Sequence, residues 1–327
     1  MNLYRKLIPF ALLLAVGVVA LGAYVRLSDA GLGCPDWPGC YGKITPHHAS
    51  AAINEAQAQN PGGPVTPAKA WKEMAHRYFA GALGLLVLAL AVLATRHRLE
   101  TRGSPALPVA LLCVVVFQAL LGMWTVTELL KPFIVTAHLL GGMTTVALLV
   151  WLWQRESGPS LRGMADVRAL RRWGVLALAA VALQIVLGGW VSTNYAALAC
   201  QDFPLCHGEW VPAMDFEPAF TPHRELGRDA SGNFLSLPAL TAIHWTHRLW
   251  ALGALAFAGI LAVKLARQRG LCVLGALLGL LLAAQIGMGI ANVWLGLPLA
   301  LAVAHNAGAA LLLVTLVVVN FKLFRMR

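Results

Sequence analysis

Long apolar stretches, separated by polar segments, dominate the order of residues along this chain. Eight of these stretches approach the roughly 20 residues that a helix needs to cross a bilayer. We expect all of them to be helical, because backbone groups inside lipid must pair within their own segment. The predicted spans are 7–27, 72–95, 106–127, 132–153, 173–194, 239–265, 271–293 and 297–321. The pattern therefore predicts an all-α membrane protein with eight transmembrane helices.

An internal repeat divides the chain into two halves. The segments Cys34–Cys40 and Cys200–Cys206 both read Cys-x-Asp-x-Pro-x-Cys. Other matched pairs follow the same order: His76 and His247, Arg77 and Arg248, Gln118 and Gln285, His138 and His305. With four spans in each half, the halves share one orientation in the membrane. We expect two tandem, pseudo-symmetric four-helix bundles, 1–155 and 173–327, joined by a cytoplasmic linker at 156–172.

The first span also fits the pattern of a signal peptide, because Arg5 and Lys6 precede an apolar core. We expect it to be retained, because its removal would leave the fifth span without a counterpart in the repeat. The composition suits a membrane protein, with 59% hydrophobic and 12% charged residues.

The distribution of positive charge predicts the orientation. The net charge of +11 could suit a nucleic-acid partner. However, 16 of the 25 Lys and Arg residues lie at the termini and in the loops after spans 2, 4 and 6, all on one face. Positive charge of this kind marks the cytoplasmic side. We therefore expect a protein of the plasma (inner) membrane with cytoplasmic termini, with loops 28–70 and 195–238 on the outer face, and no nucleic-acid partner.

Four cysteines fall in the outer loops. In an oxidising compartment we expect disulfides within each loop, Cys34 with Cys40 and Cys200 with Cys206. Zinc is disfavoured because each pair offers two thiolates and no matching second pair is near in sequence. Two interpretations stay open: a staple for the loop, or a redox-active or docking element.

Four histidines lie inside predicted spans at repeat-matched positions: His76, His138, His247 and His305. Polar residues at such depth are rare and usually functional. With a rise of 1.5 Å per residue, His76 and His138 lie roughly 8–9 Å below the outer surface. Two histidines at one depth on facing helices can bind the iron of a haem from both sides. We therefore predict one pair of axial ligands in each half.

The halves differ three residues before the first histidine, where the first half has Glu73 and the second has His244. Each shares a helix face with its histidine. A carboxylate in one half only suggests that this half carries out chemistry, with Glu73 as an acid or base; the alternative is an interfacial charge. Arg77 and Arg248 could contact haem propionates or reach to the membrane surface. Buried Gln118, Gln184 and Gln285 are expected to form hydrogen bonds between helices.

These motifs resemble the haem A synthase family over essentially the whole chain. The resemblance rests on Glu73-Met-Ala-His76-Arg77, His138, Thr246-His247-Arg248, His305 and the two Cys-x5-Cys loops. It implies an oxidoreductase that converts the methyl group at ring position 8 of haem O to a formyl group, which gives the haem A of terminal oxidases. It also implies substrate haem O between His76 and His138, and haem b between His247 and His305.

The partners that follow are haem O and the lipid bilayer. Haem O synthase (the farnesyltransferase), an electron donor and a second copy of the chain are further candidates. Two other functions are weighed against this one. A dihaem electron-transfer cytochrome would explain the four histidines but not the single carboxylate. A haem carrier would exchange haem without forming a product.

Overall fold

The computed structural model describes residues 2–98, 103–157 and 167–325. Eight helices in this part of the chain are long and apolar enough to cross a membrane. They are α1 (Asn2–Leu27), α3 (Pro67–Arg96), α4 (Ala106–Thr127), α5 (Pro132–Ser157), α6 (Val167–Thr193), α8 (Leu237–Ala266), α9 (Cys272–Trp294) and α10 (Leu299–Arg325). The predicted all-α multi-pass architecture is confirmed. Most of the predicted linker, 158–166, lies outside the described residues.

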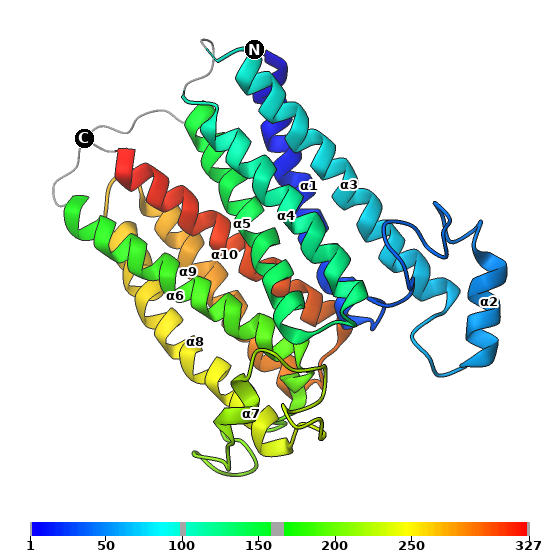
Figure 1. Ribbon diagram of the computed structural model, residues 1–327. Coiled ribbons are helices and arrows are strands. Elements are labelled where there is room, and N and C mark those ends of the chain that lie inside the picture. Colours follow the sequence, from blue (N-terminus) through cyan, green and yellow to red (C-terminus); the bar gives the residue numbers. More distant parts are fainter. Residues whose placement is uncertain (1, 99–102, 158–166, 326–327) are drawn as a thin grey trace.

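The four long helices of each half pack in a closed ring. In the first half, α1 packs on α3, α3 on α4, α4 on α5 and α5 on α1. In the second half, α6 packs on α8, α8 on α9, α9 on α10 and α10 on α6. The halves meet where α5 and α10 pack on each other, with α1 against α10 and α5 against α6 (Figure 1). Each ring therefore encloses its own interior, in which a site can form.

Two hydrogen bonds join the halves at the outer ends of α1 and α6. The Arg26 guanidinium donates to the Ser192 carbonyl at 2.7 Å, and the Tyr195 hydroxyl donates to the Asp29 carboxylate at 2.8 Å. Both pairs are 166 residues apart in sequence, which is the separation of the two cysteine segments. Residues at equivalent places thus contact each other, as a two-fold relation would require, although the symmetry itself stays a prediction.

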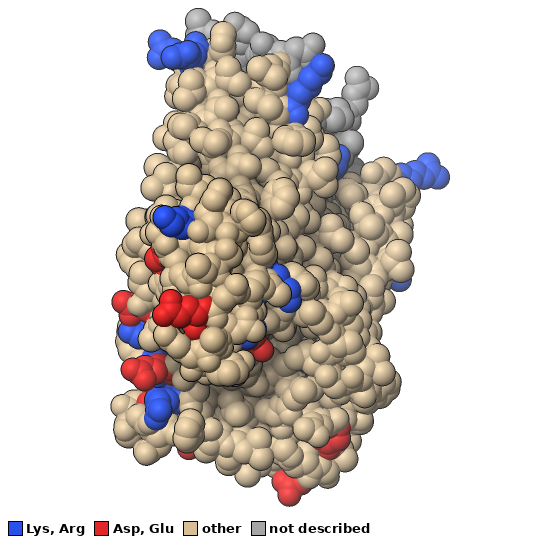
Figure 2. All heavy atoms as spheres, turned by 90° about the vertical axis from the view of Figure 1, so that its right-hand side faces the viewer, with Lys and Arg blue, Asp and Glu red and all other residues tan. Residues whose placement is uncertain are grey.

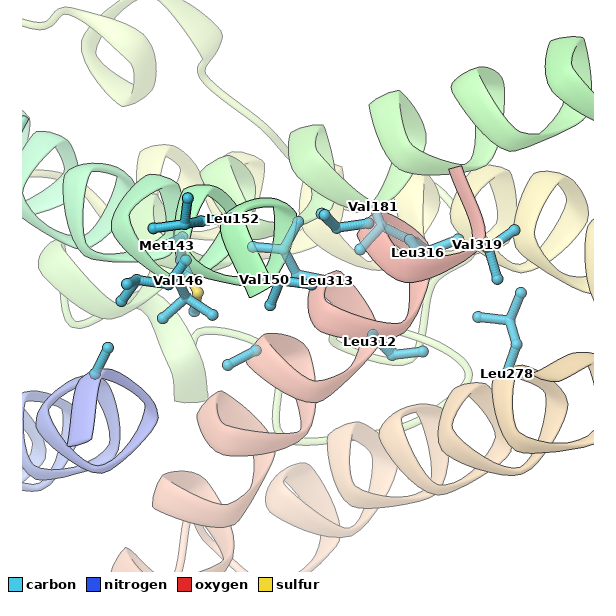
Figure 3. Packing of buried hydrophobic residues seen from close by; sticks show 14 of the residues in the cluster. Met143, Val146, Val150, Leu152, Val181, Leu278, Leu312, Leu313, Leu316 and Val319 are labelled. Carbon is cyan, nitrogen blue, oxygen red and sulfur yellow. The ribbon is translucent and has the colours of Figure 1, made fainter. Parts of the chain in front are cut away.

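A shared apolar core fills the part of the molecule away from the outer loops. Buried side chains of α5, including Met143, Val146 and Val150, face Leu313 and Leu316 of α10 (Figure 3). Many other large apolar side chains on the long helices are exposed, as expected of helices that face lipid. The core therefore joins the two halves into one packed body and leaves the outer ends for polar structure.

The two long segments predicted to lie on the outer face contain short elements that periodicity did not predict. These are α2 (Ser50–Gln59), a 3₁₀ turn (Ala196–Leu198) and α7 (Phe216–Phe220). They lie at one end of the molecule, and both termini lie at the other (Figure 1). On the face drawn in Figure 2, acidic side chains gather toward the end that carries the outer segments, and Lys and Arg occur at both ends. The termini are thus on one side of the helix layer.

Two long helices begin earlier than hydropathy predicts, because polar caps extend them. Thr66 accepts a hydrogen bond from the Lys69 amide at 3.2 Å, and Pro67 occupies the first turn of α3. Ser236 accepts in the same way from the Ala239 amide at 3.3 Å at the start of α8. Such caps satisfy amides that the helix cannot pair internally. Both helices therefore extend to where the cysteine loops can pack on them.

Candidate functional site

All four predicted histidines lie inside the helix rings, each against a glycine of a neighbouring helix. His76 of α3 faces Gly22 of α1, and His138 of α5 faces Gly122 of α4. In the second half His247 of α8 faces Gly188 of α6, and His305 of α10 faces Gly289 of α9. A Cβ placed on each glycine would come within 3.0–3.2 Å of the imidazole Cε1. Because glycine has no side chain, these four positions leave the space that the four imidazole rings occupy.

The paired histidines fit the axial ligands of a metal-bearing macrocycle. The ring centroids of His76 and His138 are 6.4 Å apart. This suits a metal bonded to one nitrogen of each ring, since such bonds are about 2 Å and a ring centre lies roughly 1 Å from its nitrogen. In all four histidines Nδ1 is buried without a partner, although the residues are only partly buried. The distance between the first two imidazole rings is therefore the observation that fits a metal held between them.

Three partly buried glutamines contact the histidine backbones. Nε2 of Gln118 donates a hydrogen bond to the His138 carbonyl at 2.6 Å. In the same way, Gln184 donates to the His247 carbonyl at 3.2 Å. Gln285 donates to the His305 carbonyl at 2.9 Å. The expected interhelical hydrogen bonds are confirmed. Sequence reasoning did not indicate that their acceptors would be the carbonyls of the predicted ligand histidines.

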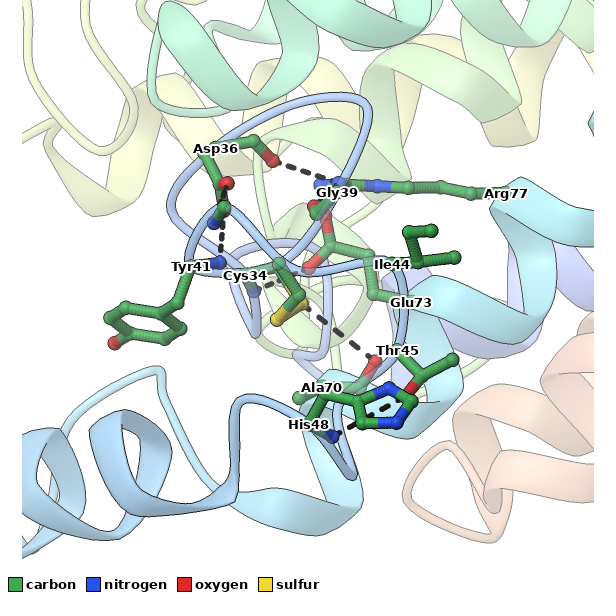
Figure 4. The surroundings of a disulfide bond; sticks show 12 residues. Cys34, Asp36, Gly39, Tyr41, Ile44, Thr45, His48, Ala70, Glu73 and Arg77 are labelled. Atoms are coloured by element: carbon green, nitrogen blue, oxygen red, sulfur yellow. Dashed lines mark hydrogen bonds and ion pairs between the residues drawn. A yellow bond between two sulfur atoms is a disulfide. The ribbon is translucent and has the colours of Figure 1, made fainter.

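The first cysteine loop packs onto α3 around Glu73 and Arg77 (Figure 4). Cys34 and Cys40 form a disulfide. The Asp36 carboxylate accepts hydrogen bonds from the amides of Tyr41 at 2.6 Å and Gly42 at 2.7 Å. Both amides belong to a turn in which φ is positive, 51° at Tyr41 and 67° at Gly42. The Asp of the motif therefore stabilises the turn that brings the second cysteine back to the first.

Glu73 connects this loop to α3. Its side chain is buried, and its carboxylate accepts a hydrogen bond from the Cys34 amide at 2.9 Å. The same carboxylate forms an ion pair with Arg77. Arg77 in turn donates to the carbonyls of Asp36 at 2.8 Å and Pro38 at 3.3 Å. A single connected set of bonds thus links the disulfide loop, Glu73 and the helix turn that carries His76.

The second cysteine loop repeats this arrangement with a histidine in place of the carboxylate. Cys200 and Cys206 form a disulfide. The Cys200 amide lies 3.3 Å from Nδ1 of His244, and Nε of Arg248 lies 3.1 Å from its Nε2. The other nitrogens of Arg248 donate to the carbonyls of Cys200, Asp202 and Leu205 at 2.8–3.0 Å. His244 therefore occupies the same junction as Glu73, which the sequence did not establish.

Arg77 and Arg248 donate hydrogen bonds to backbone carbonyls of the two cysteine loops. Their contact with haem propionates, expected from sequence, stays a prediction. His207 is a further residue that sequence reasoning did not single out: its Nε2 lies 3.3 Å from the Thr241 hydroxyl, and it neighbours the sulfurs of Cys200 and Cys206. The corresponding residue of the first loop is Tyr41, so only an alignment of the two loops could have indicated this difference.

Fold and site together define a multi-pass membrane protein with two pairs of histidines inside its helix rings and a disulfide loop in each half. A sequence model of the COX15-CtaA family, described as cytochrome oxidase assembly protein, matches residues 5–317. The chain belongs to this family.

Individual relatives agree. The chain is 43% identical to a haem A synthase of Shewanella oneidensis over 324 residues, which cover 97% of this chain and 96% of that protein. It is 31% identical to a haem A synthase of Methylobacterium over 276 residues, 78% of this chain and 73% of the relative. With a haem A synthase of Halalkalibacterium halodurans the identity is 27% over 257 residues, covering 76% and 79%.

Proposed function

We propose that this protein is a haem A synthase, an oxidoreductase that converts the ring-8 methyl group of haem O to the formyl group of haem A. The similarity to haem A synthases across nearly the whole chain supports this function. In the structure, the function is supported by the two matched histidine sites. Only the first site has a carboxylate, that of Glu73, on the helix turn before its first histidine. An electron-transfer cytochrome or a carrier would have no use for that difference.

We assign the substrate haem O to His76 and His138, and haem b to His247 and His305. The 6.4 Å between the centroids of the first two imidazole rings, and the glycine that faces each of the four imidazoles, favour histidine ligation. When bound, haem b would supply a one-electron redox centre beside the substrate half. The apolar tail of haem O would lie against the lipid-facing helices.

In the substrate half, Glu73 is the group that can hold or release a proton. Its carboxylate lies one helix turn from His76 and is held by the Cys34 amide and by Arg77. A positioned acid or base is needed because oxidation of a methyl group to a formyl group releases protons. Arg77 keeps this carboxylate in place and joins it to the loop. The apolar, closely packed helices of the two helix rings limit the access of water to Glu73.

The orientation follows from the charge distribution. We assign both termini and the Lys- and Arg-rich loops to the cytoplasm, and both disulfide loops to the outer side of the plasma membrane. The partners that fit are the lipid bilayer, haem O synthase as the source of substrate, and a separate electron donor. A second copy of the chain is a further candidate partner, which a measurement of molecular mass in solution would test.

The test is the pigment content of cells that make haem O, with and without this protein. We expect haem A only in cells that express the intact protein. The matched control is Glu73→Gln, expressed to the same level. A membrane that retains haem O unchanged while the protein binds haem would identify a cytochrome or a carrier instead.

A further inference from the structure

A cavity of about 240 Å³ lies at the end of the first helix ring that carries the cysteine loop. Its lining includes Arg26 and Asp29 at the end of α1 and just after it, and Lys69 in the first turn of α3. Leu130, in the turn between α4 and α5, and Tyr195 of the second half also line it. The helices of the first ring and the start of the second outer segment therefore meet around one cavity.

The cavity lies beyond the first histidine pair along the helix axes. Lys69 precedes His76 by seven residues, which is two helix turns on the same face and roughly 10 Å of rise. Arg26 follows Gly22, the glycine that faces the His76 imidazole, by four residues, or roughly 6 Å. Both cationic side chains are thus placed on the side of His76 that carries the cysteine loop.

Two cations and one carboxylate line the cavity. The Arg26 guanidinium donates to the Ser192 carbonyl at 2.7 Å and lies 4.0 Å from the centroid of the Tyr195 ring. Asp29 already accepts from the Tyr195 hydroxyl and lies 3.7 Å from Arg26. A guanidinium has five N–H groups, so Arg26 keeps free donors. Among the described residues, the Lys69 ammonium has no hydrogen-bond or salt-bridge partner. The cavity therefore offers excess positive charge and unused donors, which suit a carboxylate ligand.

The repeat places uncharged residues at the equivalent positions of the second half. The 166-residue offset that relates the two cysteine segments places Ser192 where the first half has Arg26. The 171-residue offset that relates the first histidines of the two halves places Leu240 where the first half has Lys69. This pair of cations is therefore a feature of the first half, the one assigned to the substrate.

We propose that Arg26 and Lys69 bind the propionate carboxylates of haem O in the first half. The inference rests on the proposed function and deepens it, because it says how the substrate is oriented. Both propionates lie at one rim of the macrocycle, so a haem ligated by His76 and His138 can place both of them in this cavity. Arg77 is not needed for this contact, since it pairs with Glu73 and donates to loop carbonyls.

Binding at this cavity also orients the group that reacts. The ring-8 methyl of haem O lies next to a propionate on the haem rim. On α3, Glu73 lies between Lys69 and His76 in sequence. Propionates held by Lys69 and Arg26 therefore place the ring-8 methyl toward the end of the helix ring at which Glu73 lies. The two cations select the orientation in which the carboxylate and the methyl are at the same end.

The first experiment titrates the purified protein with haem O and, separately, with the dimethyl ester of haem O, in which both propionates are uncharged. Absorption spectra follow binding, and His76→Ala identifies the part of the signal that belongs to the first half. We expect the unaltered protein to bind haem O about 10–100-fold more tightly than the ester, the range for hydrogen bonds to a charged group. Equal affinity for the two compounds would overturn the inference without reference to any variant of the cavity.

The second experiment repeats both titrations with Lys69→Met, which removes the ammonium and keeps the length of the side chain. We expect haem O to bind about tenfold more weakly and the ester to bind as before, because the ester offers no charge to Lys69. Lys72→Met is the matched control: Lys72 is on the same helix, and its ammonium lies 4.9 Å from the centroid of the Tyr24 ring. It should change neither affinity.

A ratio of the two affinities that is the same in Lys69→Met as in the unaltered protein would contradict the role of Lys69. An equal loss of haem O affinity in Lys72→Met would also contradict it, since the effect would then be one of overall charge. Formation of haem A in cells is scored separately. Its absence would refute the proposed function, whereas the ratio of affinities tests the propionate site alone, so the two failures can be told apart.

Discussion

The two junctions between a disulfide loop and its helix have the same shape and different chemistry. At the first, Glu73 accepts from the Cys34 amide and from Arg77, since an ionised carboxylate has acceptor sites for both. At the second, His244 faces the Cys200 amide and Arg248 with its two ring nitrogens. A neutral imidazole carries a proton on one of these nitrogens, so it can accept only one of the two hydrogen bonds.

This difference distinguishes what holds the loop on its helix from what only the first junction contains. Holding the loop requires an acceptor for the cysteine amide, which either residue provides. Glu73 adds a negative charge, which balances the charge of Arg77. The second junction leaves Arg248 without a carboxylate on its own helix turn. The repeat therefore kept the scaffold in both halves and placed a carboxylate at the junction in one.

The largest expected effect comes from removing the histidines themselves. His247→Ala or His305→Ala should abolish the stable haem b spectrum of the purified protein, because a buried axial ligand is lost. His76→Ala or His138→Ala should leave that spectrum and remove haem A formation and the retention of haem O. Absorption spectra and extracted pigments measure both. If all four variants lost the same haem equally, the assignment of different haems to the halves would be wrong.

The second effect concerns Glu73. Glu73→Gln should reduce haem A formation by about 10²–10⁴-fold, the usual contribution of a general acid or base. Glu73→His, which copies the second half, should keep an acceptor for the Cys34 amide and still fail to restore product. The controls are the haem b spectrum and the disulfide content, which both variants should retain. Normal product from either variant would reduce Glu73 to a structural contact.

The third effect tests how firmly the arginines hold the loops. Arg248→Met removes donors to three loop carbonyls, and a buried acceptor left unpaired costs about 1–3 kcal/mol. We expect a lower unfolding temperature and faster reduction of the Cys200–Cys206 disulfide, measured by thiol labelling. Arg77→Met is the matched variant and should affect the Cys34–Cys40 disulfide. Equal reduction of both disulfides in each variant would contradict separate junctions.

The sequence predicted the helices and histidines of both halves but not the hydrogen bonds that connect the cysteine loops to the helices. The apolar runs located all eight spans, and the repeat located the histidines, because both depend on local pattern. The bond from Cys34 to Glu73 joins residues 39 apart, and nothing in either segment indicates the other. The role of His244 was open for the same reason. The position of each histidine against a glycine of a neighbouring helix was not predicted, since spacing does not reveal which side chain fills the space opposite.

The smallest expected effect is at Asp202, the motif aspartate of the second loop. Its carboxylate accepts from the amides of His207 at 2.9 Å and Gly208 at 2.8 Å. Chiefly the Gly208 amide lowers the pKa of Asp202 below its ordinary value of 3.8. Because the folded pKa is the lower one, the carboxylate stabilises the loop above the unfolded pKa, and this stability is lost as the pH falls through the folded pKa.

Asp202→Asn should therefore cost about 0.5 kcal/mol near neutral pH, a small value because the site is open to water. The difference between the variant and the unaltered protein should shrink below a pH of about 4, where the carboxylate becomes protonated. Thermal unfolding and the rate of disulfide reduction, followed from pH 7 to pH 3, would measure this. Asp36→Asn is the matched change in the first loop, where the adjoining Glu73–Arg77 pair supplies a second anchor. A difference that grew toward acid pH would show that Asp202 stabilises the loop by means other than its ionised carboxylate.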